Sequence, residues 1–131
     1  MPAIEAVILD SSALLELLTN GRKANDIEKI WNDETISIEI PSVVLAELSS
    51  VLRRQDIESA TLREKIAANC TVLDLTKEIA LKAGELHAEL RKKSKTISLA
   101  DCIIMTHADN EGAVIVTKDP HFELYKNSRI L

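Results

Sequence analysis

Hydrophobic residues along this chain gather in short runs separated by longer stretches with helical spacing. The run over residues 6–9 contains no polar position, which is typical of a strand buried on both faces. Residues 37–41 alternate instead and end at a proline. The predicted strands cover residues 6–9, 37–41, 70–75 and 113–117, with a fifth at the sheet edge over residues 129–131.

Between the strands, apolar residues recur three and four positions apart, which predicts helices. The predicted helices cover residues 11–18, 24–31, 42–53, 57–68, 77–92 and 98–108, and a short turn follows over residues 121–125. Strands that alternate with helices form parallel sheets covered on both faces. The pattern therefore predicts an α/β fold: one domain over residues 1–131, with a doubly wound parallel sheet of four or five strands.

The length of 131 residues fits one domain, and a hydrophobic content of 46% is enough for one core. Aromatic residues make up only 2% of the chain, which leaves few platforms on which nucleic-acid bases could stack. The net charge of −5 argues against nucleic-acid binding driven by surface charge alone. It leaves room for an acidic site that meets phosphate groups through bound cations.

The two cysteines, Cys70 and Cys102, lie in apolar runs and are predicted to be reduced core residues, as in a reducing compartment. The N-terminus lacks the basic start of a signal peptide, and Asp10 interrupts the apolar run that follows. No apolar run approaches the roughly 20 residues that span a bilayer. We therefore predict a cytoplasmic domain without membrane contact.

Two aspartates follow predicted strands directly. Asp10 comes after residues 6–9, and Asp119 comes just past residues 113–117. Ligands of open parallel α/β sheets bind beyond the carboxyl ends of the strands, where both side chains would lie. We therefore expect these two acids to meet at one edge of the sheet.

Two further acids lie on helix faces that also carry apolar residues. Glu47 shares one row of its predicted helix with Val43 and Val51, so it is turned toward protein. Asp101 precedes Ile104 by one helical turn. A buried carboxylate is costly unless it is paired or bound to a cation.

Three of these acids also have a purely structural interpretation. Asp10 can cap the helix that starts at Ser11, Asp119 precedes a proline suited to a first helical position, and Ser98 with Asp101 fits a capping box. Taken singly, each is better explained as a cap. Glu47 lies in mid-helix and has no such role, so the four acids together predict a shared pocket.

A cluster of carboxylates cannot stay fully ionised unless positive charge balances it, because like charges raise one another's pKa. Oxygen ligands favour Mg²⁺ or Mn²⁺, and the usual work of such a site is phosphoryl chemistry with an oriented water. Ser12, or its neighbour Ser11, and Thr117 would add hydroxyl groups beside Asp10 and Asp119. The three histidines lack the spacing of a zinc site, and three glycines are too few for a phosphate-binding loop.

Four segments of the chain resemble the PIN-domain nucleases, and within them the toxins of VapBC-type toxin–antitoxin pairs. The segments are residues 7–15 (VILDSSALL), 41–47 (PSVVLAE), 99–104 (LADCII) and 116–122 (VTKDPHF). Their order and intervals fit the family across nearly the whole chain. The resemblance implies a PIN-like doubly wound sheet and an endoribonuclease that depends on Mg²⁺ or Mn²⁺.

The resemblance also implies roles for particular residues. The catalytic and metal-binding acids would be Asp10, Glu47, Asp101 and Asp119, with supporting hydroxyl groups at Ser12 and Thr117. Family members commonly form homodimers and are silenced by a cognate antitoxin protein that reaches into the acidic pocket. The family often carries another acid just before the phenylalanine, where this chain has His121, so the number of bound ions stays open.

An RNA substrate would have to approach an acidic pocket on an acidic protein. Six basic residues could form a rim that contacts backbone phosphates: Arg53, Arg54, Arg91, Lys92, Lys93 and Lys95. Basic residues at helix C-termini are equally well explained by the helix dipole. The sequence favours neither the RNA rim nor the helix dipole as the explanation.

Three other functions compete with the toxin hypothesis. A housekeeping RNA-processing nuclease would use the same fold and site. A catalytically silent binding module would give no reason to bury Glu47. A phosphatase built on Asp10 is disfavoured, because the second aspartate expected two residues later is Ser12 in this chain.

Overall fold

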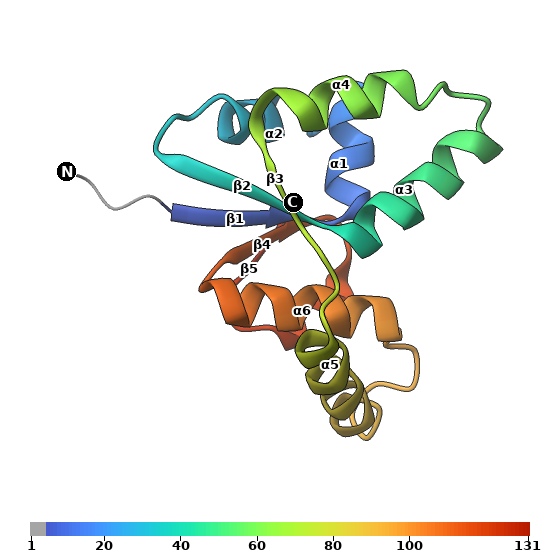
Figure 1. Ribbon diagram of the computed structural model, residues 1–131, viewed down its shortest axis with the longest axis vertical. Helices are drawn as coiled ribbons and strands as arrows, with labels where there is room; N and C mark the ends of the chain where they lie inside the picture. The colour runs from blue at the N-terminus through green and yellow to red at the C-terminus, as the bar shows by residue number, and fades with distance from the viewer. Residues whose placement is uncertain (1–4) are drawn as a thin grey trace.

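The computed structural model describes residues 5–131, and its centre is a five-stranded parallel sheet (Figure 1). The strand order is β3-β2-β1-β4-β5. The strands are β1 (Glu5–Leu9), β2 (Ile36–Pro41), β3 (Thr71–Leu73), β4 (Val114–Thr117) and β5 (Ser128–Ile130). All four pairings between neighbours are parallel, so the predicted parallel sheet and its fifth edge strand are confirmed.

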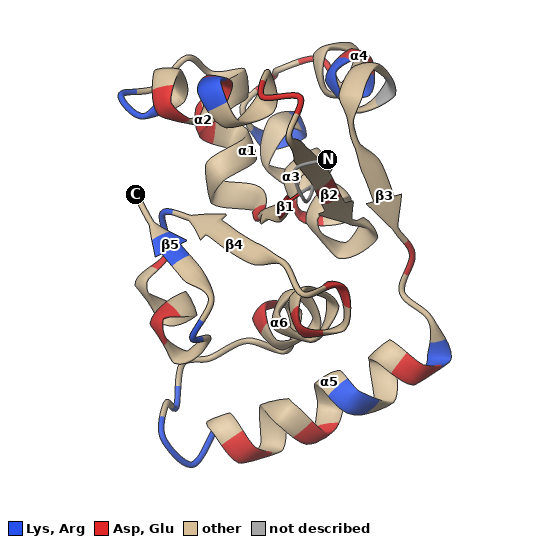
Figure 2. Cartoon of the chain, turned by 90° about the vertical axis from the view of Figure 1, so that its left-hand side faces the viewer, with Lys and Arg blue, Asp and Glu red and all other residues tan. Residues whose placement is uncertain are grey.

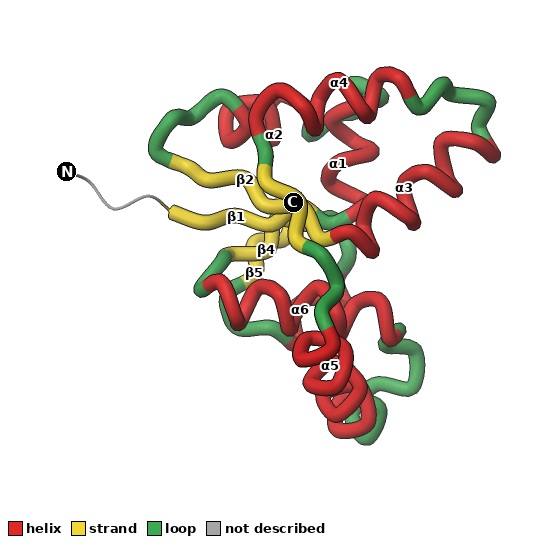
Figure 3. Tube along the Cα trace, in the orientation of Figure 1, coloured by secondary structure: helices red, strands yellow, loops and turns green. Residues whose placement is uncertain are grey.

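Helices cover both faces of this sheet, as Figures 1 and 3 show. The helices are α1 (Ser11–Leu18), α2 (Ala24–Trp31), α3 (Ser42–Arg54), α4 (Ala60–Asn69), α5 (Lys77–Leu90) and α6 (Leu99–Glu111), followed by the 3₁₀ helix η1 (Pro120–Leu124). The helices α1 to α4 lie on one face, and α5 and α6 lie on the other. The predicted doubly wound α/β fold is therefore confirmed.

The strand order places β1 in the middle of the sheet. The chain first moves outward from β1 to β2 and β3, then returns to the other side of β1 and continues with β4 and β5. Leu9 at the end of β1 pairs in register with Val116 near the end of β4. The loops after β1 and β4 therefore leave the sheet side by side at its switch point, where such folds bind ligands.

The core is almost entirely aliphatic. Ile8 and Leu9 of β1 and Ile115 of β4 are inaccessible to solvent, and Leu48 of α3 packs against the same cluster. Phe122 of η1 is also buried there, which fixes the segment that follows Asp119. Because this core holds both switch-point strands and η1, it fixes the backbone around the site.

Two predicted helix boundaries were wrong by three residues, and the helix predicted over residues 77–92 ends two residues earlier, at Leu90. The helix predicted over residues 57–68 begins at Ala60, because Asp56 adopts a positive φ of 56° and the chain turns before the helix starts. The helix predicted to end at residue 108 continues to Glu111, where Gly112 ends it with a φ of 62°. Cys102 is buried as predicted, Cys70 is only half-buried, and both are free thiols.

Within residues 5–131, no helix has the length and apolar character needed to cross a membrane.

Gly112 offers a direct test of the α6 terminus. A Cβ atom added there would meet no other atom within 4 Å, so only the left-handed backbone would oppose a side chain. We expect Gly112→Ala to lower the free energy of unfolding by about 1 kcal/mol. Gly84→Ala is the matched control, because Gly84 lies within α5 with equally open space and alanine is the better helix former. Denaturant unfolding measures both variants. A change in stability in the same direction for both would contradict the role of the left-handed backbone at Gly112.

Candidate active site

Asp10 lies at the carboxyl end of β1 and caps α1. Its Oδ1 accepts hydrogen bonds from the Ala13 backbone N–H (3.0 Å) and the Ser12 hydroxyl (2.8 Å). Its Oδ2 accepts one from the Thr117 hydroxyl (2.5 Å). The residue is only 3% exposed, and this burial raises its pKa against the lowering effect of the three donors. The carboxyl group is therefore held in one orientation by both strand ends.

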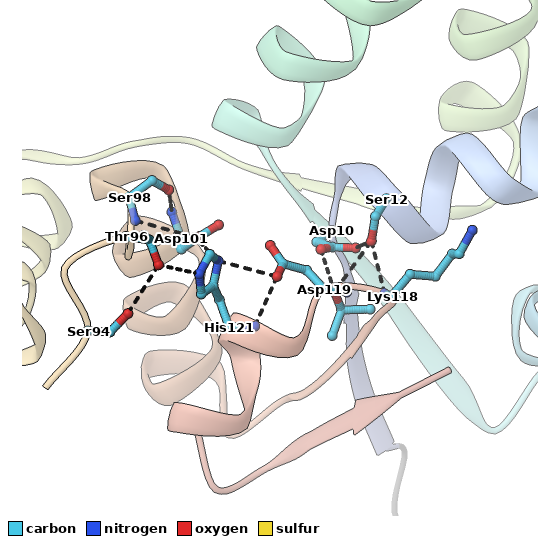
Figure 4. Close-up of polar contacts among 10 residues, drawn as sticks. Asp10, Ser12, Ser94, Thr96, Ser98, Asp101, Lys118, Asp119 and His121 are labelled. Atoms are coloured by element: carbon cyan, nitrogen blue, oxygen red, sulfur yellow. Dashed lines mark hydrogen bonds and ion pairs between the residues drawn. The ribbon is translucent and has the colours of Figure 1, made fainter.

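The hydroxyl groups of Ser12 and Thr117 extend this network to the loop after β4 (Figure 4). Ser12 Oγ accepts a hydrogen bond from the Lys118 backbone N–H (2.9 Å), and Thr117 Oγ1 accepts one from the Asp119 backbone N–H (2.9 Å). Both hydroxyl groups predicted to support the acids thus contact Asp10, and they also fix the backbone that leads to Asp119.

Asp101 lies in the first turn of α6, where the predicted capping box is present. The Ser98 hydroxyl accepts a hydrogen bond from the Asp101 backbone N–H (3.0 Å), and Asp101 Oδ2 accepts one from the Ser98 backbone N–H (3.5 Å). Burial raises the pKa of Asp101, with a further contribution from the charge of Asp119, against the lowering effect of Ser98. Asp101 is therefore both a cap and a neighbour of the second strand-end acid.

Asp119 caps η1 through its Oδ1, which accepts a hydrogen bond from the His121 backbone N–H (2.9 Å). The same turn brings the His121 ring back toward the acids. His121 Nδ1 lies 3.3 Å from Asp119 Oδ1 and 3.8 Å from Asp101 Oδ2. His121, Asp101 and Asp119 thus form one cluster of side chains.

Glu47 reaches this cluster from α3. It is half-buried, and burial raises its pKa, followed by the charges of Asp101 and Asp10; the Ser11 hydroxyl opposes the shift. The charge of Asp119 also raises this pKa, and it raises the pKa of Asp10 and Asp101 as well. The four acids that the sequence pattern singled out therefore lie near enough for their charges to interact, but Asp10 and Glu47 are not among the residues whose ligand atoms lie within 4.8 Å of one another.

The donor atoms of this cluster fit a divalent cation. One ligand atom from each of Asp101, Asp119 and His121 lies within 4.8 Å of the other two. Two carboxylates and an imidazole are ligand types that divalent metal ions accept, and a cation would offset the mutual repulsion of the acids. The crowding of like charges at the strand ends is consistent with this assignment.

The six basic residues considered as an RNA rim are all exposed. Arg53 and Arg54 end α3, roughly 9 Å along the helix from Glu47 at 1.5 Å per residue. The other four lie on the loop between α5 and α6, which Figure 2 shows as a basic segment. Lys92 is paired with Glu89 on this surface at 3.1 Å.

Two contacts at the site were not predicted from the sequence. The Thr96 hydroxyl lies 2.8 Å from His121 Nε2, and Lys118 forms an ion pair with Glu16 at 2.5 Å. Thr96 and His121 are 25 residues apart in the chain, and no periodic pattern relates them. Only the position of His121 within the fourth PIN-like segment pointed to this region.

The sequence profile of the PIN domain matches residues 7–127. The chain belongs to the PIN-domain family. This match spans all four segments quoted above and confirms the resemblance.

Two relatives are named as nucleases. The chain is 27% identical over 114 residues to a tRNA(fMet)-specific endonuclease VapC from Salmonella typhimurium, covering 86% of this chain and 85% of the relative. It is 30% identical over 98 residues to the ribonuclease VapC2 of Rickettsia felis, covering 72% and 71%.

Solved structures agree on the fold. A VapBC2 complex from Rickettsia felis bound to a DNA fragment from its promoter contains a chain with a TM-score of 0.74 and 23% identity, covering 96% of this chain and 97% of that one. VapC20 of Mycobacterium tuberculosis, a toxin that cleaves the sarcin-ricin loop, has a TM-score of 0.72 and 16% identity, covering 90% and 93%. Similarity at this level establishes the architecture.

The raised pKa of Glu47 predicts a pH-dependent stability change. A carboxyl group with a raised pKa keeps its proton longer in the folded state, so folding stability falls as pH rises from about 4 through the raised value. We expect Glu47→Gln to raise the melting temperature of the metal-free protein at pH 7, and the gain to shrink toward pH 4. Thermal denaturation in EDTA across this range measures the effect.

Glu64→Gln is the control for this experiment, because Glu64 is an exposed glutamate of α4. A gain for Glu47→Gln that stayed constant between pH 4 and pH 7 would contradict the electrostatic origin of the effect.

Proposed function

We propose that this chain is a metal-dependent endoribonuclease and the toxin of a type II toxin–antitoxin pair. The single observation that carries the proposal is the group of four interacting carboxyl groups at the switch point of a PIN fold. The names of the VapC relatives, an endonuclease and a ribonuclease, support the reaction class. The solved VapBC complexes that contain a chain of similar fold support the toxin assignment.

Mg²⁺ or Mn²⁺ is the proposed cofactor, and Asp10, Glu47, Asp101 and Asp119 are the proposed ligands and catalytic acids. When bound, such an ion supplies positive charge for the phosphate oxygens and lowers the pKa of water for attack on the phosphodiester. Burial raises the pKa of Asp10, Glu47 and Asp101, and the charges of neighbouring acids add to each shift, which supports a cation at this position.

The chain's own residues hold this site in place. Ser12 and Thr117 orient Asp10 by donating hydrogen bonds to both of its carboxylate oxygens. The capping interactions of Asp101 and Asp119 fix the first turns of α6 and η1. Because these contacts exist before substrate binds, the acidic side chains would need little rearrangement during the reaction.

The substrate in this proposal is RNA, whose backbone would follow the exposed basic residues toward the acids. Arg53 and Arg54 lie on one side, at the end of α3, and the loop of residues 91–95 leads into α6 and Asp101. Basic side chains that contact phosphates position a nucleic acid without reading its sequence.

A cognate antitoxin protein is the proposed inhibitor. The acidic pocket favours a positively charged segment of that partner, because a cation or a basic side chain would relieve the same repulsion. The homodimer implied by the family resemblance stays a prediction, which size-exclusion chromatography with light scattering would test.

Asp101→Asn tests the reaction and the site together. We expect metal-dependent cleavage of a panel of structured RNAs to fall by at least about 100-fold, because a ligand is lost while the amide oxygen still caps α6. Asp109→Asn is the matched control, since Asp109 is an exposed aspartate of the same helix. Cleavage by Asp101→Asn at the wild-type rate would show that the site is wrong.

Growth arrest on expression separates a toxin from a housekeeping nuclease of the same fold. Arrest that requires Asp101 and is relieved by the product of an adjacent small gene supports the toxin. Normal growth combined with metal-dependent RNA cleavage supports the housekeeping alternative. Metal binding without cleavage by wild type would favour a catalytically silent binding module.

The basic loop offers a test of substrate binding. We expect the double variant Lys93→Gln/Lys95→Gln to weaken RNA binding by similar factors for unrelated sequences. The slope of the logarithm of the binding constant against the logarithm of the salt concentration should become shallower by about 1 to 2. Binding measured at several salt concentrations in EDTA checks this. Lys29→Gln is the control, because Lys29 is an exposed lysine of α2. Equal effects of Lys29→Gln and the double variant would remove the loop from the interface.

A further inference from the structure

The His121 ring has polar contacts on two sides. One ring nitrogen, Nδ1, faces the carboxylates of Asp119 and Asp101 at 3.3 and 3.8 Å. The other, Nε2, lies 2.8 Å from the Thr96 hydroxyl on the loop that precedes α6 (Figure 4). The imidazole is therefore held between a polar anchor and the acids.

The Thr96 contact favours one arrangement of the ring proton when a cation is present. If Nε2–H donates to Thr96 Oγ1, then Nδ1 has a free lone pair directed at the cluster. The Thr96 hydroxyl can in turn donate a hydrogen bond to Ser94 Oγ, which lies 3.5 Å away. Histidines that bind metal ions characteristically donate their second ring N–H to such a partner, which orients the ring.

We propose that His121 supplies a nitrogen ligand to the metal site and that this ligand makes the site prefer Mn²⁺ over Mg²⁺; this inference rests on the proposed metal-dependent function. Mg²⁺ is a hard ion that takes oxygen ligands in strict octahedral geometry. Mn²⁺ also accepts oxygen ligands, but as a member of the first-row transition-metal series it tolerates a nitrogen ligand better than Mg²⁺ does. A site in which imidazole stands where an acid is common in the family therefore loses more affinity for Mg²⁺ than for Mn²⁺.

A different arrangement competes with this proposal. His121 Nδ1 could carry a proton and donate it to Asp119 Oδ1, so that the imidazole neutralises the acids and takes the place of a cation. In that case, His121 would reduce metal binding and would never contact the metal. The two arrangements differ in whether a nitrogen atom is bonded to bound Mn²⁺.

Pulsed electron paramagnetic resonance of Mn²⁺ distinguishes them. The full chain is loaded with less than one equivalent of Mn²⁺, so that only the tightest site fills. We expect the spectrum to contain a nitrogen coupling from a directly bound imidazole. The coupling should change when histidine is labelled with ¹⁵N, and it should disappear in His121→Asp while Mn²⁺ stays bound.

Calorimetric titration with each ion then measures the preference. We expect the ratio of Mg²⁺ to Mn²⁺ dissociation constants to fall by about tenfold or more in His121→Asp, because an all-oxygen site favours Mg²⁺. Thr96 is a positioning residue in this scheme. Thr96→Val should weaken Mn²⁺ binding and alter the nitrogen coupling, and Thr96→Ser, which keeps the hydroxyl, should restore both.

The outcomes separate this inference from the proposed function. In one outcome, Mn²⁺ binds wild type tightly and Asp101→Asn weakly, but the spectrum contains no nitrogen coupling. This result overturns the role of His121 and still supports the metal site. Failure of wild type to bind Mn²⁺ overturns both the role of His121 and the metal-dependent function. Tighter Mn²⁺ binding by His121→Asp with no coupling in wild type identifies the competing arrangement.

Discussion

The burial of carboxyl groups beside one another at one edge of the sheet is the constraint on which the geometry of the site depends. Asp10 is almost fully buried beside other acids, an arrangement that opposes ionisation and folding alike. Three hydrogen bonds to its two oxygens offset part of this cost. These hydrogen bonds hold the acid in place where burial disfavours its charge, and a bound cation would offset the remaining cost.

The parallel topology creates this crowding. Because β1 and β4 are neighbours in the sheet but far apart in the chain, their ends bring together residues 107 positions apart, as in the bond between Thr117 and Asp10. The network thus joins the first and last thirds of the chain at the switch point. A shift in the register between β1 and β4 would separate Asp10 from Thr117 and would also move Asp119, so the fold and the site are specified by the same pairing.

Much of this arrangement could be predicted from the sequence, because it follows from regular elements. Asp10 and Asp119 were placed by the rule that parallel strands end at one edge, and Glu47 by helical spacing. The contact between Thr96 and His121 could not be predicted, since it depends on the conformation of the loop before α6 and on the turn of η1. The start of α4 was missed because the positive φ of Asp56 leaves no periodic signal.

The structural interpretation of the aspartates is confirmed by the capping contacts, and it is compatible with their proposed role as metal ligands. Asp10 and Asp119 are the N-caps of α1 and η1, and Asp101 completes the capping box of α6 with Ser98. The capping bonds occupy Oδ2 of Asp101 and Oδ1 of Asp119, and each carboxylate keeps its second oxygen for another partner. A cap fixes a side chain relative to rigid backbone, which is also what a ligand set requires. Helix capping would therefore also hold these aspartates in position for the proposed metal site.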